Sequence, residues 1–244
     1  MHQNDTDRTT CVADDLTVIL PTLNEETGIK TLLAQLLKEY PGVTIMVSDD
    51  GSTDKTREIV NSYGQPAVQL LDREHALVHG LTASVLDAIM MVRSRYFLVM
   101  DADGQHPYQA IGQMLSCLRQ GSALVIGTRA ISTTQWSPSR KFFSWIASFL
   151  GRIRLALGGK GWVRADILSG FFAARTESWN EVSCAHAPES MFQLQGYKIL
   201  FDFLKQLDRN KRYAKVQYEF QVRQKDSSKI NCKVILEYLK SLIR

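Results

Sequence analysis

Two carboxylates stand one residue apart where an apolar run of the sequence ends. In RYFLVMDADGQHP, residues 95–107, the run YFLVM is followed by Asp101 and Asp103, and the amide Gln105 comes two positions later. Side chains at positions i and i+2 of an extended chain point to the same side, so these oxygens can converge on one object. Mg²⁺ and Mn²⁺ prefer such ligands and often share one or two carboxylates with substrate phosphates. The structural alternative is a plain turn in which an Asp caps the next helix.

Polar residues also end three other apolar runs in the first half of the chain. PTLNEE and DDGSTD follow two of these runs, and GTR closes the third. Asp50 is a candidate ligand contact, because a carboxylate there can accept hydrogen bonds from a ribose or a base. Asp54 is instead expected to cap its own helix. Polar residues at the ends of four predicted strands together predict a nucleotide-binding pocket with a metal at one side.

The elements that must position these residues alternate between strands and helices. Strand-like runs are LTVILP, VTIMVS, AVQLL, YFLVM and ALVIGT, and each pair is separated by a helical pattern, the first of which has Asn24 placed as its cap. Such alternation predicts an α/β fold, with a mostly parallel central sheet covered by helices on both faces. Ligands of these sheets bind beyond the carboxyl ends of the strands.

The second half of the chain is more mixed. It predicts a long helix from about Ser139 to Leu157, a short strand SGFFAAR, a helix SMFQLQGYKILFDFLKQL, a strand YAKVQYEFQVR and a final helix CKVILEYLKSLI. We expect a leader at residues 1–14 and one domain at 15–244, with a nucleotide-binding half at 15–130 and an acceptor half at 131–244.

Composition narrows the class of protein. The 244 residues are 45% hydrophobic and 22% charged with a net charge of +4, which is typical of a globular domain. The four cysteines lie far apart without a C-x-x-C pair, so we expect a reduced protein without a disulfide framework. The polar N-terminus does not resemble a signal peptide, and no apolar run is long enough to cross a bilayer.

These motifs resemble the family-2 glycosyltransferases of GT-A (Rossmann-like) fold, and more narrowly the dolichol-phosphate mannosyltransferases and related polyprenyl-phosphate sugar synthases. The matching segments are colinear from about residue 16 to about residue 240: VILPTLNEE, VSDDGSTDKT, VMDADGQHP, VIGTR, SGFFAAR, GYKILFDFL and the R-x-x-x-x-S-K of VRQKDSSKI. DADGQHP followed by SGF is the more specific part, whereas PTLNEE and DDGSTD mark the broader superfamily.

The resemblance implies inverting, metal-dependent transfer of a hexose, mannose first and glucose next, from a nucleotide sugar to a polyprenyl phosphate. The residues it implies for nucleotide-sugar binding are Pro21, Leu23, Glu25, Ser48, Asp50, Asp101, Ala102 and Asp103. The metal, Mg²⁺ or Mn²⁺, would be held by Asp101, Asp103 and Gln105. The residues implied in catalysis are Asp103, Arg129 and Arg140.

A phosphate acceptor is already anionic near neutral pH, so it needs cations rather than a base. The cations at matching positions are Arg129, Arg140, Lys198, Arg223 and Lys229. A family-2 enzyme acting on a sugar hydroxyl is the alternative, and Asp202 would then be the candidate base. The adjacent E-D pair common in such enzymes is missing after residue 130. A non-catalytic nucleotide-sugar-binding subunit is a second alternative.

The helix expected near residues 139–157 combines aromatic and basic residues, a pattern of core helices and also of helices that lie in a bilayer surface. Because a polyprenyl acceptor must be reached in the membrane, we expect a cytoplasmic protein, peripheral at the cytoplasmic face of a membrane. A membrane-spanning partner subunit is another route to that face. We expect no nucleic-acid partner.

Overall fold

The computed structural model describes residues 11–64, 66–130, 138–185, 191–194, 196 and 198–219, without the side chains of 138–144 and 185. Seven strands form one sheet in the order β3-β2-β1-β4-β6-β5-β7. The strands are β1 (Leu16–Thr22), β2 (Thr44–Asp49), β3 (Val68–Asp72), β4 (Tyr96–Val99), β5 (Leu124–Ala130), β6 (Phe172–Arg175) and β7 (Tyr213–Glu219). Only β6 runs antiparallel to its neighbours within this sheet. The predicted single α/β domain with a mostly parallel sheet is confirmed.

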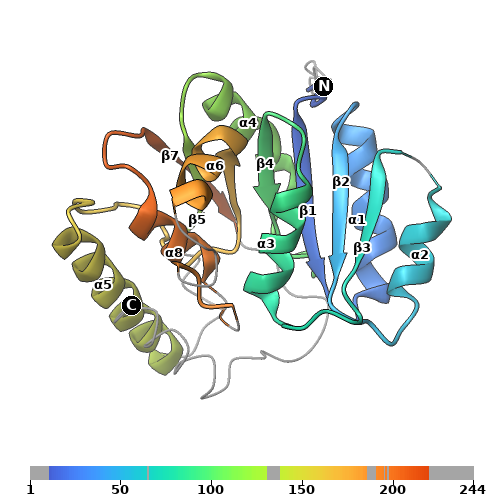
Figure 1. The fold of residues 1–244 in the computed structure, drawn as a ribbon, viewed down its shortest axis with the longest axis horizontal. Helices are drawn as coiled ribbons and strands as arrows, with labels where there is room; N and C mark the ends of the chain where they lie inside the picture. Colours follow the sequence, from blue (N-terminus) through green and yellow to red (C-terminus); the bar gives the residue numbers. More distant parts are fainter. Residues whose placement is uncertain are drawn as a thin grey trace, which may run out of the picture.

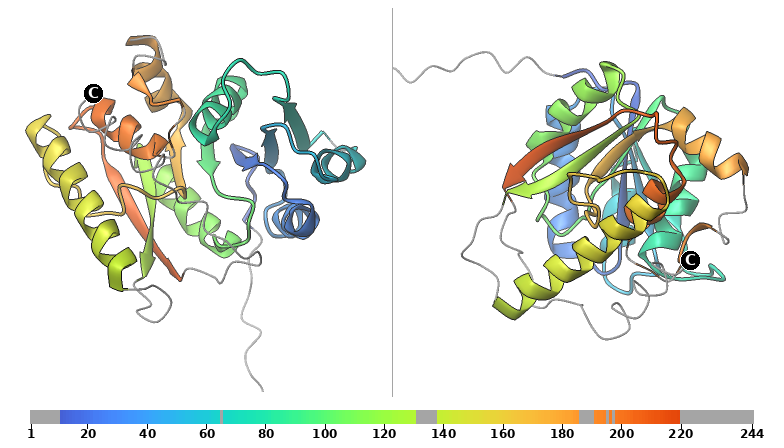
Figure 2. Two further views of the ribbon diagram at one scale, coloured as in Figure 1. Left: turned by 90° about the horizontal axis from the view of Figure 1, so that it is seen from below. Right: turned by 90° about the vertical axis from the view of Figure 1, so that its left-hand side faces the viewer.

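Helices cover both faces of the sheet (Figure 1), with α1 and α3 on opposite sides of the first strands (Figure 2). The described helices are α1 (Glu26–Glu39), α2 (Thr56–Ser62), α3 (Leu81–Met91), the 3₁₀ turn η1 (Tyr108–Ala110), α4 (Ile111–Arg119), α5 (Pro138–Leu157), α6 (Thr176–Ala185) and α8 (Ile199–Gln206). The long α5 lies at the far end of the molecule from α2 (Figure 1). None of the described helices is both long and apolar enough to cross a membrane.

The strands divide their side chains between two apolar cores. Along β1, Ile19 packs into the core on the α3 side, whereas Val18 and Leu20 pack into the core that includes α1 residues. Phe97 and Leu98 of β4 alternate in the same way. Because both faces are covered, every residue of β4 is buried, which explains why its sequence is a continuous apolar run rather than an alternating one.

Two local predictions were wrong. Asn24 does not cap α1: the cap position is Glu25, and Asn24 has a positive φ of 60°. The helix expected to run on from Ser190 is interrupted: Met191 is helical, the described residues of 192–198 are not, and α8 begins at Ile199. Gly196 lies in the loop before it, and its carbonyl accepts a hydrogen bond from the hydroxyl of Thr82 at the start of α3 (2.8 Å). A tertiary contact therefore replaces the helical pattern there.

Candidate active site

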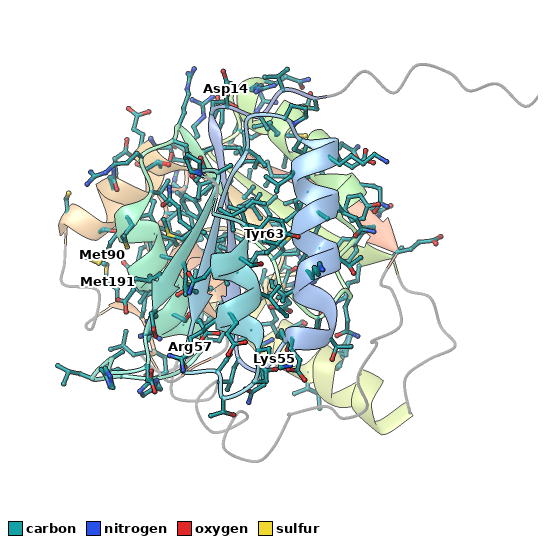
Figure 3. The ribbon with its side chains drawn as sticks, turned by 90° about the vertical axis from the view of Figure 1, so that its right-hand side faces the viewer. Asp14, Lys55, Arg57, Tyr63, Met90 and Met191 are labelled. Atoms are coloured by element: carbon teal, nitrogen blue, oxygen red, sulfur yellow. The ribbon has the colours of Figure 1, made fainter. Side chains whose placement is uncertain are left out.

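The carboxyl ends of β1, β2 and β4 meet at one edge of the sheet, because these strands are parallel neighbours. Lys55, shortly after β2, lies at this end of the domain, and Asp14, just before β1, lies at the opposite end (Figure 3). From β1 the chain adds β2 and then β3 on one side, and β4 then lies on the other side of β1, so the direction of strand addition reverses between β1 and β4. Such a switch point is where ligands bind in open α/β sheets.

Asp49 and Ser48 at the end of β2 serve the fold. Asp49 is fully buried, and its carboxylate accepts hydrogen bonds from the backbone N–H of Ser52 (2.8 Å) and the hydroxyl of Thr22 (3.0 Å). Ser48 is also fully buried, and its hydroxyl donates to the carbonyl oxygen of Ser84 in α3 (2.9 Å). Ser48 is therefore enclosed by the fold, and its carbonyl oxygen accepts from the hydroxyl of Ser84 (3.1 Å).

Asp50 is held at the rim of the site, with 12% of its side chain exposed. One carboxylate oxygen pairs with the buried Arg73 and lies 3.1 Å from Nδ1 of His79, and the other accepts from the backbone N–H of Gly80 (2.8 Å). Arg73 also pairs with Asp87 (2.8 Å). The carboxylate thus has a fixed orientation beside the switch point.

The loops after β1 and β2 cap each other's helices. Asp54 accepts from the backbone N–H of Glu26 at the start of α1 (3.1 Å), and the Glu26 carboxylate accepts from the backbone N–H of Lys55 (3.1 Å). Asp54 also accepts from the N–H of Thr56, the first residue of α2 (3.0 Å), but the cap position of α2 is Lys55 and not Asp54 as predicted. Asn24 accepts from the backbone N–H of Thr53 (2.9 Å), which joins the two loops.

The other residues predicted to bind the nucleotide sugar differ in accessibility. Pro21 lies within β1 and is half-buried, and Leu23 just after it is exposed. The backbone N–H of Glu25 donates to the hydroxyl of Thr56 (2.9 Å), and Ala102 is buried. Leu23 is thus exposed and Glu25 is half-buried, so both side chains in the loop after β1 are at least partly accessible to a ligand.

The D-x-D segment leaves β4 with its carboxylates partly open. The Asp101 side chain is 37% exposed, and the Asp103 carboxylate accepts from the backbone N–H of Gln105 (3.1 Å). A Cβ at Gly170 would lie 3.4 Å from both Asp101 oxygens, so the glycine leaves room beside them. Within the described residues, no group of three His, Cys, Asp or Glu side chains is arranged to hold a metal. Two carboxylates and an amide fit a cation that completes its shell with substrate phosphate.

His106 packs beneath the D-x-D turn, between the backbone of Asp101 and the ring of Phe171. It is buried, its Nδ1 accepts from the backbone N–H of Asp101 (3.0 Å), and its ring stacks on Phe171 with 5.0 Å between centroids. Burial lowers the pKa of the imidazole, against the opposing effect of Asp101 and Asp103. The neutral ring shapes the D-x-D turn and is not placed as a base.

Arg129, at the end of β5, is paired with a residue that the sequence analysis missed. Its Nε and Nη2 lie 3.0 and 2.9 Å from one carboxylate oxygen of Asp166. Asp166 precedes the SGF motif by three residues, and an acid so near that motif was the signal that could have identified it.

Lys198 reaches the same region from the loop before α8. Its ammonium donates to the carbonyl oxygen of Leu168 (3.0 Å). Burial lowers the pKa of Lys198, while the carboxylates of Asp166 and Asp101 raise it and Arg129 lowers it further. Lys198, from the second half, is therefore in electrostatic contact with Arg129 and Asp101 of the first half and with Asp166.

The remaining predicted residues fall outside the described structure or are enclosed by the fold. Arg223 and Lys229 fall outside the described residues, as does the Arg140 side chain. Asp202, the candidate base of the hydroxyl-acceptor alternative, is 2% exposed, pairs with Lys205 (2.9 Å) and accepts from the backbone N–H of Gln193 (3.0 Å). A carboxylate so enclosed is not in position to meet a substrate hydroxyl.

Comparison with known proteins places these features in context. The family model Glycosyl transferase family 2 matches residues 17–178. A dolichol-phosphate mannosyltransferase from Pyrococcus furiosus is 29% identical over 240 residues, which is 94% of this chain and 63% of that protein. The chain thus spans less than two thirds of that relative. An undecaprenyl-phosphate mannosyltransferase from Micrococcus luteus is 27% identical, with 93% of this chain and 91% of that protein covered.

Solved structures share the fold. Glucosyl-3-phosphoglycerate synthase from Mycobacterium tuberculosis, in complex with Mn²⁺, UDP-glucose and phosphoglyceric acid, superposes with a TM-score of 0.68 at 19% identity. The match covers 99% of this chain and 85% of that one. The predicted GT-A architecture is confirmed by this likeness.

Proposed function

This chain belongs to glycosyl transferase family 2 and is a glycosyltransferase, and we propose that it transfers a hexose, mannose first and glucose next, from a nucleotide sugar to a polyprenyl phosphate. The observation that carries the acceptor assignment is the position of Lys198, which donates to the carbonyl of Leu168 and is in electrostatic contact with Arg129 and Asp101. Relatives named for mannosyl transfer to dolichol phosphate and undecaprenyl phosphate, over more than nine tenths of this chain, support the same acceptor class.

The donor half binds the nucleotide sugar along the edge formed by β1, β2 and β4. Leu23 and Glu25 face the nucleoside from the first loop, and Asp50 accepts hydrogen bonds from its base or ribose. Asp101 and Asp103 lie next to the diphosphate. A divalent cation held by Asp101, Asp103 and Gln105 supplies Lewis-acid neutralisation of the charge on the departing diphosphate.

The acceptor half binds the second anion. An Arg guanidinium is suited to forked contacts with phosphate oxygens and a Lys ammonium to a point-charge contact, so Arg129 and Lys198 hold the acceptor phosphate against repulsion from the donor. Arg140, Arg223 and Lys229 belong to the same proposed set. An acceptor oxygen attacks the anomeric carbon in line, the bond to the diphosphate breaks with its electron pair, and the configuration inverts. No proton has to be removed, which agrees with the enclosed position of Asp202.

The acceptor reaches the enzyme from a membrane surface, and α5 supplies the contact. Residues 131–165 contain six Lys or Arg and no Asp or Glu. Trp145 of α5 is 60% exposed and stacks on the exposed Phe149 (5.4 Å between centroids), and Trp162, 50% exposed, lies edge-on to Phe149 at 6.3 Å. Exposed aromatic rings beside cations are typical of an interface with anionic lipid.

Sedimentation with vesicles tests this surface. Trp145→Ser combined with Trp162→Ser should reduce binding to anionic vesicles by about tenfold. The matched control replaces Met90 and Met91, which are 72% and 49% exposed on α3, with Ser. Equal binding by both double variants would remove α5 from the membrane contact.

Transfer of labelled sugar tests the function itself. GDP-mannose and UDP-glucose are each offered with a short polyprenyl phosphate and with a hydroxyl acceptor, in Mg²⁺, in Mn²⁺ and with chelator. We expect glycolipid from the phosphate acceptor, only with metal. Turnover with hydroxyl acceptors alone would contradict the proposal, and metal-dependent donor binding without any turnover would identify a binding subunit instead.

A further inference from the structure

Asp166 lies at the start of a short segment that contacts Arg129 and Lys198, the two cations proposed above to hold the acceptor phosphate. One of its carboxylate oxygens meets both Nε and Nη2 of Arg129, and the other accepts from the backbone N–H of Leu168 (3.3 Å). The backbone N–H of Asp166 is 3.4 Å from the hydroxyl of Thr128, the residue before Arg129. The carboxylate is thus fixed both to its own turn and to β5.

The contact with Arg129 is directional. A guanidinium is a rigid plane with its donors in fixed directions, so a carboxylate that meets Nε and one Nη sets the orientation of the whole group. The two side chains are 27% and 16% exposed, which separates this pair from a fully solvated surface pair whose geometry is loose. Arg129 is therefore presented in one orientation.

The same segment also contacts Lys198 and Asp101. The carbonyl oxygen of Leu168, two residues after Asp166, accepts from the Lys198 ammonium. Gly170, two residues further, lies against the Asp101 carboxylate, with 3.4 Å between a virtual Cβ and both oxygens. Residues 166–170 therefore connect both cations to the D-x-D turn through consecutive contacts.

We propose that Asp166 is a positioning residue that orients Arg129 toward the acceptor phosphate and, through the turn it anchors, sets the place of Lys198 relative to Asp101. This inference rests on the proposed phosphate acceptor. Asp166 itself does not touch the substrate. We expect its main effect on acceptor binding, because its side-chain hydrogen bonds are with Arg129 of β5 and with Leu168 of its own turn.

Asp166→Asn keeps the shape of the side chain and removes its charge. With a short polyprenyl phosphate we expect the KM for the acceptor to rise and kcat to fall, so that kcat/KM drops by about 10- to 100-fold. The Kd of the sugar nucleotide and the Tm should stay unchanged. In an Arg129→Ala background the same substitution should have little further effect, because the residue it acts through is gone.

Asp15→Asn is the matched control. It breaks a comparable pair, in which Arg119 meets Asp15 at 2.7 and 3.1 Å beside the start of β1. Acceptor kinetics of Asp166→Asn that equal those of Asp15→Asn would overturn the inference, as would fully additive effects with Arg129→Ala. A wild-type protein that neither binds nor glycosylates the polyprenyl phosphate would overturn the proposed function first. A wild-type enzyme that does so, with Asp166→Asn unaffected, would overturn only the positioning role.

Discussion

The donor half and the acceptor half fix their charged side chains in different ways. In the donor half, Asp49 accepts from the N–H of Ser52 three residues later and Asp103 from that of Gln105 two residues later, although Asp50 is held across 23 residues by Arg73. Among the cations proposed for the acceptor, Arg129 is held across 37 residues by Asp166 of the acceptor half, and Lys198 by a carbonyl 30 residues away. A site built from local turns can be recognised as a sequence motif, whereas one built from tertiary contacts has no such signature.

The largest expected effect belongs to the donor half. Asp103→Ala removes a carboxylate of the proposed metal site, and transfer should fall by at least about 100-fold because charge on the leaving diphosphate is no longer neutralised. Labelled-sugar transfer across a Mg²⁺ or Mn²⁺ titration measures it. Asp72→Asn, at the end of β3, is the control and should retain activity. Full activity in Asp103→Ala would remove the metal hypothesis.

The next effect concerns stability rather than chemistry. Asp49→Ala leaves the buried donors of Ser52 and Thr22 without their carboxylate, and the free energy of unfolding should fall by about 3 kcal/mol. Urea denaturation measures the change. Asp103→Ala, whose carboxylate is partly open to solvent, should change stability by less than about 1 kcal/mol. If both variants lost the same free energy of unfolding, Asp49 would contribute no more to stability than Asp103, and the division between them would be wrong.

The smallest effect tests the acceptor half through pH. Burial lowers the pKa of Lys198 below its ordinary value of 10.5, so its charge is lost earlier as pH rises, and transfer should decline with it. Lys198→Arg stays charged throughout, and its activity relative to wild type should therefore rise a few-fold, by about 2 to 5, at alkaline pH. The same shift makes the folded state bind fewer protons than the unfolded state between the lowered pKa and 10.5, so this group makes stability increase with pH there.

Lys211→Arg is the control for that profile, since Lys211 pairs with Glu181 on the surface at 2.8 Å. Its profile should follow that of wild type. Parallel profiles for wild type and Lys198→Arg would mean that the ammonium does not act on the acceptor phosphate.

Local sequence patterns predicted the elements of the sheet well, because burial on both faces forces continuous apolar strands and amphipathic helices. They failed at the helix expected from Ser190, where the carbonyl of Gly196 turns toward Thr82 in α3. They also failed at Asn24, whose side chain joins two loops rather than capping α1. In both cases a partner distant in sequence decides the backbone conformation.

The sequence by itself determined the alternating α/β order, the edge at which polar tips gather, and the D-x-D segment, since each follows from spacing along a few residues. Only the tertiary structure decided which acids are enclosed by the fold, that Asp202 is buried in an ion pair, and that Asp166 holds Arg129. The reason is physical: burial, hydrogen bonding and charge pairing depend on what the folded chain brings together, and a sequence position does not specify its partner.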